Sequence, residues 1–122
     1  MQQPRIPVWM VGALGFEKSM SRALKYDGIL PNKKVPGVEV ARVTPDDIRP
    51  LPEQARAARG GGAWDIVVED HTPGDDPSAA RAIAQPFADA GATWFIEAMW
   101  DSMDDPHGLD AVFKRARQGP PR

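Results

Sequence analysis

The stretch IPVWMVGALGFEKSMSRALKY, residues 6–26, contains the pattern on which the expected fold depends. Residues 6–11 form a nearly continuous apolar run, which is typical of a strand buried on both faces in a parallel sheet. The glycine-containing segment 12–15 follows as a tight connection. The apolar residues at positions 16, 20, 23 and 24 then have the spacing of an amphipathic helix. This stretch therefore predicts one β-strand, a short loop and one α-helix.

Three more strand–helix units are expected farther along the chain. Short strands are predicted over residues 28–30, where Pro31 ends the strand, over 65–69 and over 92–98. Residues 31–43 are predicted to be a long basic connection. Repeated βα alternation implies parallel strands joined by right-handed crossovers. The expected fold class is therefore α/β, a parallel (βα)4 unit equal to half of a TIM-type (β/α)8 barrel, with strands adjacent in chain order and helices on one outer side.

Local residues predict where the helices begin and end. Thr44, followed by Pro45 and Asp47, is the expected N-cap and capping box of one helix. The prolines at positions 50 and 52 each remove a helical hydrogen bond, so this helix is predicted to break and to resume over residues 53–59. The remaining boundaries are an N-cap at Asp76, a proline kink at Pro86, a glycine end at Gly91 and a terminal helix over 109–117.

The composition excludes several classes of function. The chain has 122 residues, enough for one domain, and a formal net charge of −2 with scattered basic residues, so no nucleic-acid surface is expected. The absence of cysteine excludes disulfides, thiolate metal sites and cysteine nucleophiles. No apolar run approaches twenty residues and no signal peptide is recognisable, so a cytoplasmic location without membrane contact is expected. His71 and His107 are far apart in sequence, so no metal site is predicted.

Several segments, taken in order, resemble the luciferase-like family of flavin- and deazaflavin-dependent enzymes. They are QQPRIPVWMVG at 2–12, RALKYDGILP at 22–31, VTPDDI at 43–48, DIVVE at 65–69, TPGDDP at 72–77 and AGATWFIE at 90–97. The likeness extends from residue 2 to about residue 118 and implies a (β/α)8 barrel, of which 1–122 would be a single partial domain, the C-terminal half. The prolines at positions 50 and 52 depart from the family, which has an unbroken helix there.

The loop formed by Gly12, Ala13, Leu14 and Gly15 is the candidate cofactor-binding segment. It lies between a strand and a helix, where free backbone N–H groups and a helix N-terminus favour an anion. The resemblance implies that this loop lies near the phosphate tail of FMN or of a deazaflavin coenzyme. The plainer interpretation is a βα turn in which glycine only allows a tight connection.

Four residues at the ends of two predicted strands are candidates for the pocket rim: Glu69, His71, Glu97 and Trp100. Barrel enzymes place their sites at the carboxyl ends of strands. His71, next to Asp70, could transfer a proton near neutral pH, although a solvated loop is the favoured interpretation for this segment. Trp100 could wall a ring-shaped ligand, and Glu97 could instead pair with a basic residue. No catalytic residue is identified.

The resemblance implies part of a flavoprotein oxidoreductase or monooxygenase that acts on a small-molecule substrate. The chain would contribute the phosphate loop and half of the pocket rim. Since the other half is expected to be missing, the isolated chain is predicted to be inactive and to self-associate or to pair with an N-terminal half. The alternative is a non-catalytic truncated half-barrel that folds by pairing with another chain. A phosphate-binding α/β module without a redox role is a third possibility.

Overall fold

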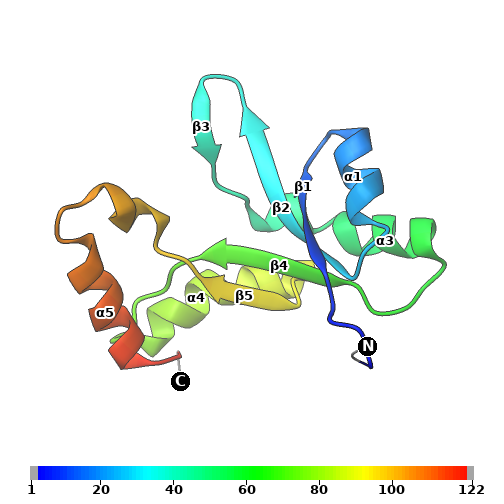
Figure 1. Ribbon diagram of the computed structural model, residues 1–122. Helices are drawn as coiled ribbons and strands as arrows, with labels where there is room; N and C mark the ends of the chain where they lie inside the picture. The colour runs from blue at the N-terminus through cyan, green and yellow to red at the C-terminus, as the bar shows by residue number, and fades with distance from the viewer. Residues whose placement is uncertain (1–2, 121–122) are drawn as a thin grey trace.

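The computed structural model describes residues 3–120 as a five-stranded sheet with helices along it (Figure 1). Four strands are parallel and adjacent in chain order: β1 (Trp9–Ala13), β2 (Gly28–Val35), β4 (Asp65–Asp70) and β5 (Trp94–Glu97). The prediction of an α/β fold with this strand order is confirmed. The short strand β3 (Val38–Ala41) pairs antiparallel with β2.

The helices begin and end close to where local residues predict. They are α1 (Glu17–Ala23), α2 (Pro45–Ile48), α3 (Leu51–Arg59), α4 (Pro77–Ala90), the short 3-10 helix η1 (Trp100–Asp104) and α5 (Gly108–Gln118). Thr44 and Asp47 form the capping box of α2, Asp76 accepts hydrogen bonds as the N-cap of α4, and Gly91 ends α4 in a left-handed conformation. The predicted break between α2 and α3 is also present, and α3 resumes at Leu51 because Pro52 is tolerated in a first turn.

The prediction that Pro31 ends the second strand is wrong, as is the long connection over 31–43. β2 continues through Pro31 to Val35, turns, and forms a hairpin with β3 that extends away from the rest of the sheet (Figure 1). β4 pairs with β2 only at Gly28 and Ile29. Beyond that point one edge of β2 has no β4 partner, a position where a strand proline costs no ladder hydrogen bond.

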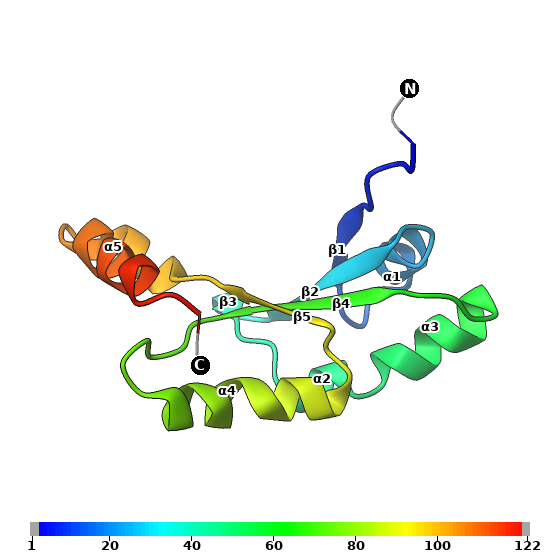
Figure 2. The ribbon, with the colours of Figure 1, turned by 90° about the horizontal axis from the view of Figure 1, so that it is seen from below.

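One face of the parallel sheet is covered by helices and forms the core. Ile29, Ile66 and Val68 point from the strands into a cluster with side chains of α1, α2, α3 and α4. The helix residues are Ala23, Ile48, Leu51, Ala55, Phe87 and Ala90. Figure 2 shows α2, α3 and α4 together on one side of the sheet. The prediction of helices on one side is thus confirmed for α1 to α4, whereas α5 lies beyond the carboxyl ends of the strands (Figure 2).

The opposite face of the sheet has no helix packed over its centre within residues 3–120, and we call it the open face. Alternation along the strands places Trp9, Leu30, Val67, Trp94 and Ile96 there. The rings of Trp9 and Trp94 approach to 5.4 Å between centroids and cover part of this face. The open face is therefore mainly apolar, with tryptophans from both outer strands and with Asp65 and Glu69 toward the two ends of β4. In the described part of the chain, no helix has the length and apolarity needed to cross a membrane.

Candidate functional site

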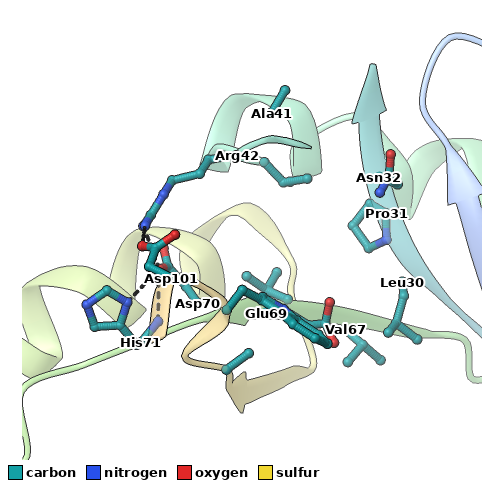
Figure 3. A pocket seen from close by; sticks show the side chains of 14 residues that line it. Leu30, Pro31, Asn32, Ala41, Arg42, Val67, Glu69, Asp70, His71 and Asp101 are labelled. Atoms are coloured by element: carbon teal, nitrogen blue, oxygen red, sulfur yellow. Dashed lines mark hydrogen bonds and ion pairs between the residues drawn. The ribbon is translucent and has the colours of Figure 1, made fainter. Parts of the chain in front are cut away.

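A cavity of about 130 Å³ lies between the middle of β2 and the carboxyl end of β4, and parallel-sheet enzymes place their sites at the carboxyl ends of strands. Leu30, Pro31 and Asn32 form one wall, and Glu69, Asp70 and His71 form another (Figure 3). Arg42, from the segment between β3 and α2, and Trp100 and Asp101, from η1, also line it. The hairpin and η1 therefore bring residues to this edge that are distant in sequence.

Arg42 closes the cavity by bridging two carboxylates. Its Nη1 donates to Asp70 Oδ1 at 3.1 Å and its Nη2 donates to Asp101 Oδ2 at 2.6 Å (Figure 3). The Arg42 side chain is mostly exposed, so solvent screens both ion pairs and their contribution to stability is small. Their effect is to hold η1 near the end of β4. Sequence reasoning missed Arg42 and Asp101, because only the folded chain brings them to the predicted rim.

Of the predicted rim residues, Glu69, His71 and Trp100 lie together in this cavity. His71 Nδ1 is 3.9 Å from Asp70 Oδ1, too far for a hydrogen bond, while the His71 backbone N–H donates to the same oxygen at 2.8 Å. Asp70 thus shapes the turn after β4, as the solvated-loop interpretation predicts. With Glu69, Asp70 and Asp101 facing one guanidinium, the cavity is acidic overall and disfavours a phosphate.

Glu97 lies outside that cavity and anchors α5 instead. Its Oε1 accepts the Thr72 N–H at 2.6 Å, and its Oε2 accepts the Thr72 hydroxyl and Arg115 Nη2, each at 2.9 Å. Arg115 also donates through Nε to the Thr72 carbonyl at 2.8 Å. The second interpretation of Glu97, pairing with a basic residue, is therefore confirmed. Thr72 is almost fully buried, whereas the Glu97 side chain is 28% exposed, so this network is only partly shielded from water.

A wider hollow of about 710 Å³ separates the end of β5 from α5. Ile96, Met99, Trp100, Val112 and Ala116 give it apolar walls, with Glu97 and Arg115 at one side. Trp100 lines both this hollow and the acidic cavity. The indole of Trp100 therefore separates a polar compartment from an apolar one, an arrangement suited to a ligand with one polar and one flat apolar end.

Fewer backbone N–H groups of the segment 12–15 are free to bind an anion than the sequence predicts. Gly12 and Ala13 lie inside β1, and Gly12 is buried, with Ile29 and Ala23 filling the space where a side chain would be. The Ala13 N–H donates to Ser19 Oγ at 2.9 Å and the Leu14 N–H donates to the Asn32 carbonyl at 2.8 Å. The absence of a side chain at Gly12 thus allows close packing of Ile29 and Ala23 in the core.

Gly15 is the one member of the loop with open space around it. Its φ is 79°, no atom lies within 4 Å of where a Cβ would stand, and within residues 3–120 its N–H has no acceptor. Phe16 follows, and Lys34 of β2 holds its Nζ 5.9 Å from the centre of the Phe16 ring. The Phe16 N–H donates to the Ala13 carbonyl at 3.2 Å, so the residues fit a phosphate only at the Gly15 N–H, with Lys34 as counter-charge, rather than along the whole of 12–15.

Within residues 3–120, no three histidine or carboxylate side chains gather closely enough to hold a metal ion. No family model, no curated protein and no solved structure matches this chain.

Proposed function

We propose that this chain is part of a flavin- or deazaflavin-dependent oxidoreductase or monooxygenase, and that it contributes a phosphate-contacting segment and half of a pocket rim. The observation that carries the proposal is the division of charge along one edge of the sheet. Lys34 lies over the Phe16 ring, next to the open Gly15 backbone that follows β1, while Glu69, Asp70 and Asp101 gather at the end of β4. A coenzyme with an anionic tail and an uncharged ring system suits this polarity.

Each group has a role in binding under this proposal. Gly15 binds the phosphate through its backbone N–H and Lys34 binds it through its positive charge. Trp100 gives a flat apolar wall for the ring system. Arg42 and His71 orient a small polar substrate at the acidic cavity. The coenzyme supplies the hydride or oxygen chemistry, so the protein needs few acids and bases of its own.

A flavin binding test distinguishes a specific phosphate contact from non-specific binding of the flavin ring. FMN and riboflavin differ only in the phosphate, so their fluorescence quenching by the purified protein should differ. We expect Lys34→Ala to weaken FMN binding about tenfold, which corresponds to ~1.4 kcal/mol, and to leave riboflavin unchanged. Lys25→Ala, at the far end of α1, is the matched control. A deazaflavin coenzyme is titrated in parallel.

Two results would overturn this proposal. The first is no saturable binding of FMN or of the deazaflavin coenzyme. The second is an equal loss of FMN and riboflavin affinity in Lys34→Ala, which would mean that the lysine acts without a phosphate. A second candidate function, a non-catalytic half-barrel that pairs with another chain, is supported by the exposed apolar open face and predicts the first result.

A further inference from the structure

The parallel sheet ends in two outer strands that lack the usual protection. Within residues 3–120, β1 pairs only with β2 and β5 pairs only with β4. Natural proteins protect free strand edges with charged residues, prolines or bulges. β1 has the sequence WMVGA and contains no charge, and the only charge of β5, on Glu97, is engaged by Arg115. Both edges are therefore open to pairing with another strand.

The open face is large enough to be an interface. Val11 is 58% exposed and Trp94 is 53% exposed, and both point to this face. Trp100, 60% exposed, lines the hollow that continues to Val112 (38%) of α5. Taking ~150–250 Å² for each fully exposed large apolar side chain, these four side chains expose roughly 400 Å² of apolar area. A standard interface buries ~800 Å² per partner, of which somewhat over half is apolar, so the two areas agree.

We propose that the occupant of the open face is a second copy of this chain, and that the two copies close an eight-stranded parallel barrel around a two-fold axis. β5 of one copy lies beside β1 of its partner, and the same contact is repeated on the opposite side of the barrel. Both free edges belong to parallel strands, so each copy continues the other's sheet and the arrangement closes. The open faces become the barrel interior, which side chains fill.

This inference rests on the proposed function in one respect. The two-fold axis runs along the barrel, so the carboxyl ends of all eight strands lie at one end. Each acidic cavity then shares an edge with the Gly15–Phe16 segment of the partner, and the rim that one chain leaves open is completed by the other. A ligand at the end of β5 would thereby contact both copies.

The chain contains no cysteine, so a cysteine introduced by substitution is its only thiol and can be crosslinked specifically. Val11→Cys on β1 and Ile96→Cys on β5 both face the interior, next to the proposed junction. A mixture of the two variants, treated with a short bifunctional maleimide, should yield a dimer that joins one variant to the other. Each variant alone should give little crosslinked dimer, because identical strands lie across the barrel from each other. Val35→Cys, on the protruding hairpin, is the control for random collision.

Sedimentation velocity gives the second measurement. The wild-type chain should sediment as a dimer at micromolar concentration, and Trp94→Glu should shift it toward monomer, whereas Val35→Glu should not. A wild-type monomer would overturn the inference, as would efficient crosslinking of Val11→Cys with itself, since that indicates two sheets packed face to face. A crosslinked dimer without FMN or deazaflavin binding would retain the closed barrel and overturn only the proposed function.

Discussion

Replacing Gly12 with alanine is expected to destabilise the protein through its core. A Cβ on Gly12 would overlap Cδ1 of Ile29 and would lie 2.8 Å from its Cγ1 and 3.5 Å from Cβ of Ala23. Ile29 and Ala23 are both fully buried, so neither has free space to move into. Overpacking of this kind costs about 1–3 kcal/mol. The loss of glycine flexibility in the unfolded chain offsets ~0.4–1 kcal/mol of that cost.

The net loss should therefore be about 1–2 kcal/mol, or a decrease in Tm of roughly 3–10 °C for a domain of this size. Urea denaturation at constant m-value measures it directly. The larger Gly12→Val change should cost more, since two further methyl groups enter the same space. If cofactor affinity falls in these variants, it should fall in proportion to the unfolded fraction, and not because the phosphate is pushed away.

A double-mutant cycle tests whether overlap with Ile29 causes the loss of stability in Gly12→Ala. Ile29→Val removes the Cδ1 atom that overlaps the new methyl group and costs ~0.5–1.5 kcal/mol alone. Combined with Gly12→Ala, it should relieve the overlap, so the double variant should be about 0.5–1.5 kcal/mol more stable than the sum of the single effects predicts. Gly15→Ala is the control, because it strains a φ of 79° without touching Ile29. Additive effects, or a Gly12→Ala protein as stable as wild type, would refute this reasoning.

Other predictions concern the polar contacts. Arg115→Ala should destabilise the protein by about 1–3 kcal/mol, because it leaves the carbonyl of the buried Thr72 without its donor and the Glu97 carboxylate without its counter-charge, whereas Arg117→Ala should change the unfolding free energy by less than about 0.5 kcal/mol. Desolvation raises the pKa of Asp47, but hydrogen bonds from Lys33 and Thr44 outweigh it and hold this pKa below its ordinary value. The stability that ionised Asp47 provides is thus complete above the unfolded-state pKa and lost as pH falls through the lower folded-state pKa. Asp47→Asn should therefore lower the free energy of unfolding by about 1 kcal/mol at pH 7, and by progressively less as the solution is acidified. Urea denaturation at several pH values measures this loss, and a loss that is equal at neutral and acidic pH would contradict the assignment. Arg42→Ala should lower stability by less than about 1 kcal/mol in thermal melts, because its ion pairs are exposed, and a larger loss would show that the bridge to η1 organises the cavity.

The features that the sequence predicts correctly depend on neighbouring residues. Helix ends depend on residues that lie within a few positions of each other, so no distant contact is needed to recognise them. Examples are the capping box at Thr44 and Asp47 and the glycine end at Gly91. The β2–β3 hairpin was missed because Pro31 is normally excluded from a central strand. Pro36 and Gly37, between Val35 and Val38, are the residues of a type II turn, and the φ of 79° at Gly37 agrees with that turn. Reading this pair as a turn would have predicted the hairpin.

The candidate site could be predicted only where it follows strand ends. Glu69 and His71 follow β4 directly, so the rule that sites lie at carboxyl ends locates them. Arg42 and Asp101 are 59 positions apart and meet only because the hairpin and η1 approach the same edge. The Arg115 partner of Glu97 lies on a helix that follows a loop of no recognisable pattern. Such pairs cannot be predicted from the spacing of neighbouring residues in the sequence.

The two strand glycines, Gly12 and Gly28, allow close packing on the two faces of the sheet. Gly12 accommodates Ile29 on the helix-covered face, while a Cβ on Gly28 would lie 2.7 Å from Cδ1 of Trp9 on the open face. Trp9 can therefore lie flat across β2, where its Nε1 donates to Asp65 Oδ2 at 3.0 Å and its ring meets Trp94. Association costs free energy for every side chain that it must immobilise. Because these indoles are held in place within one chain, pairing at the open face requires little further ordering.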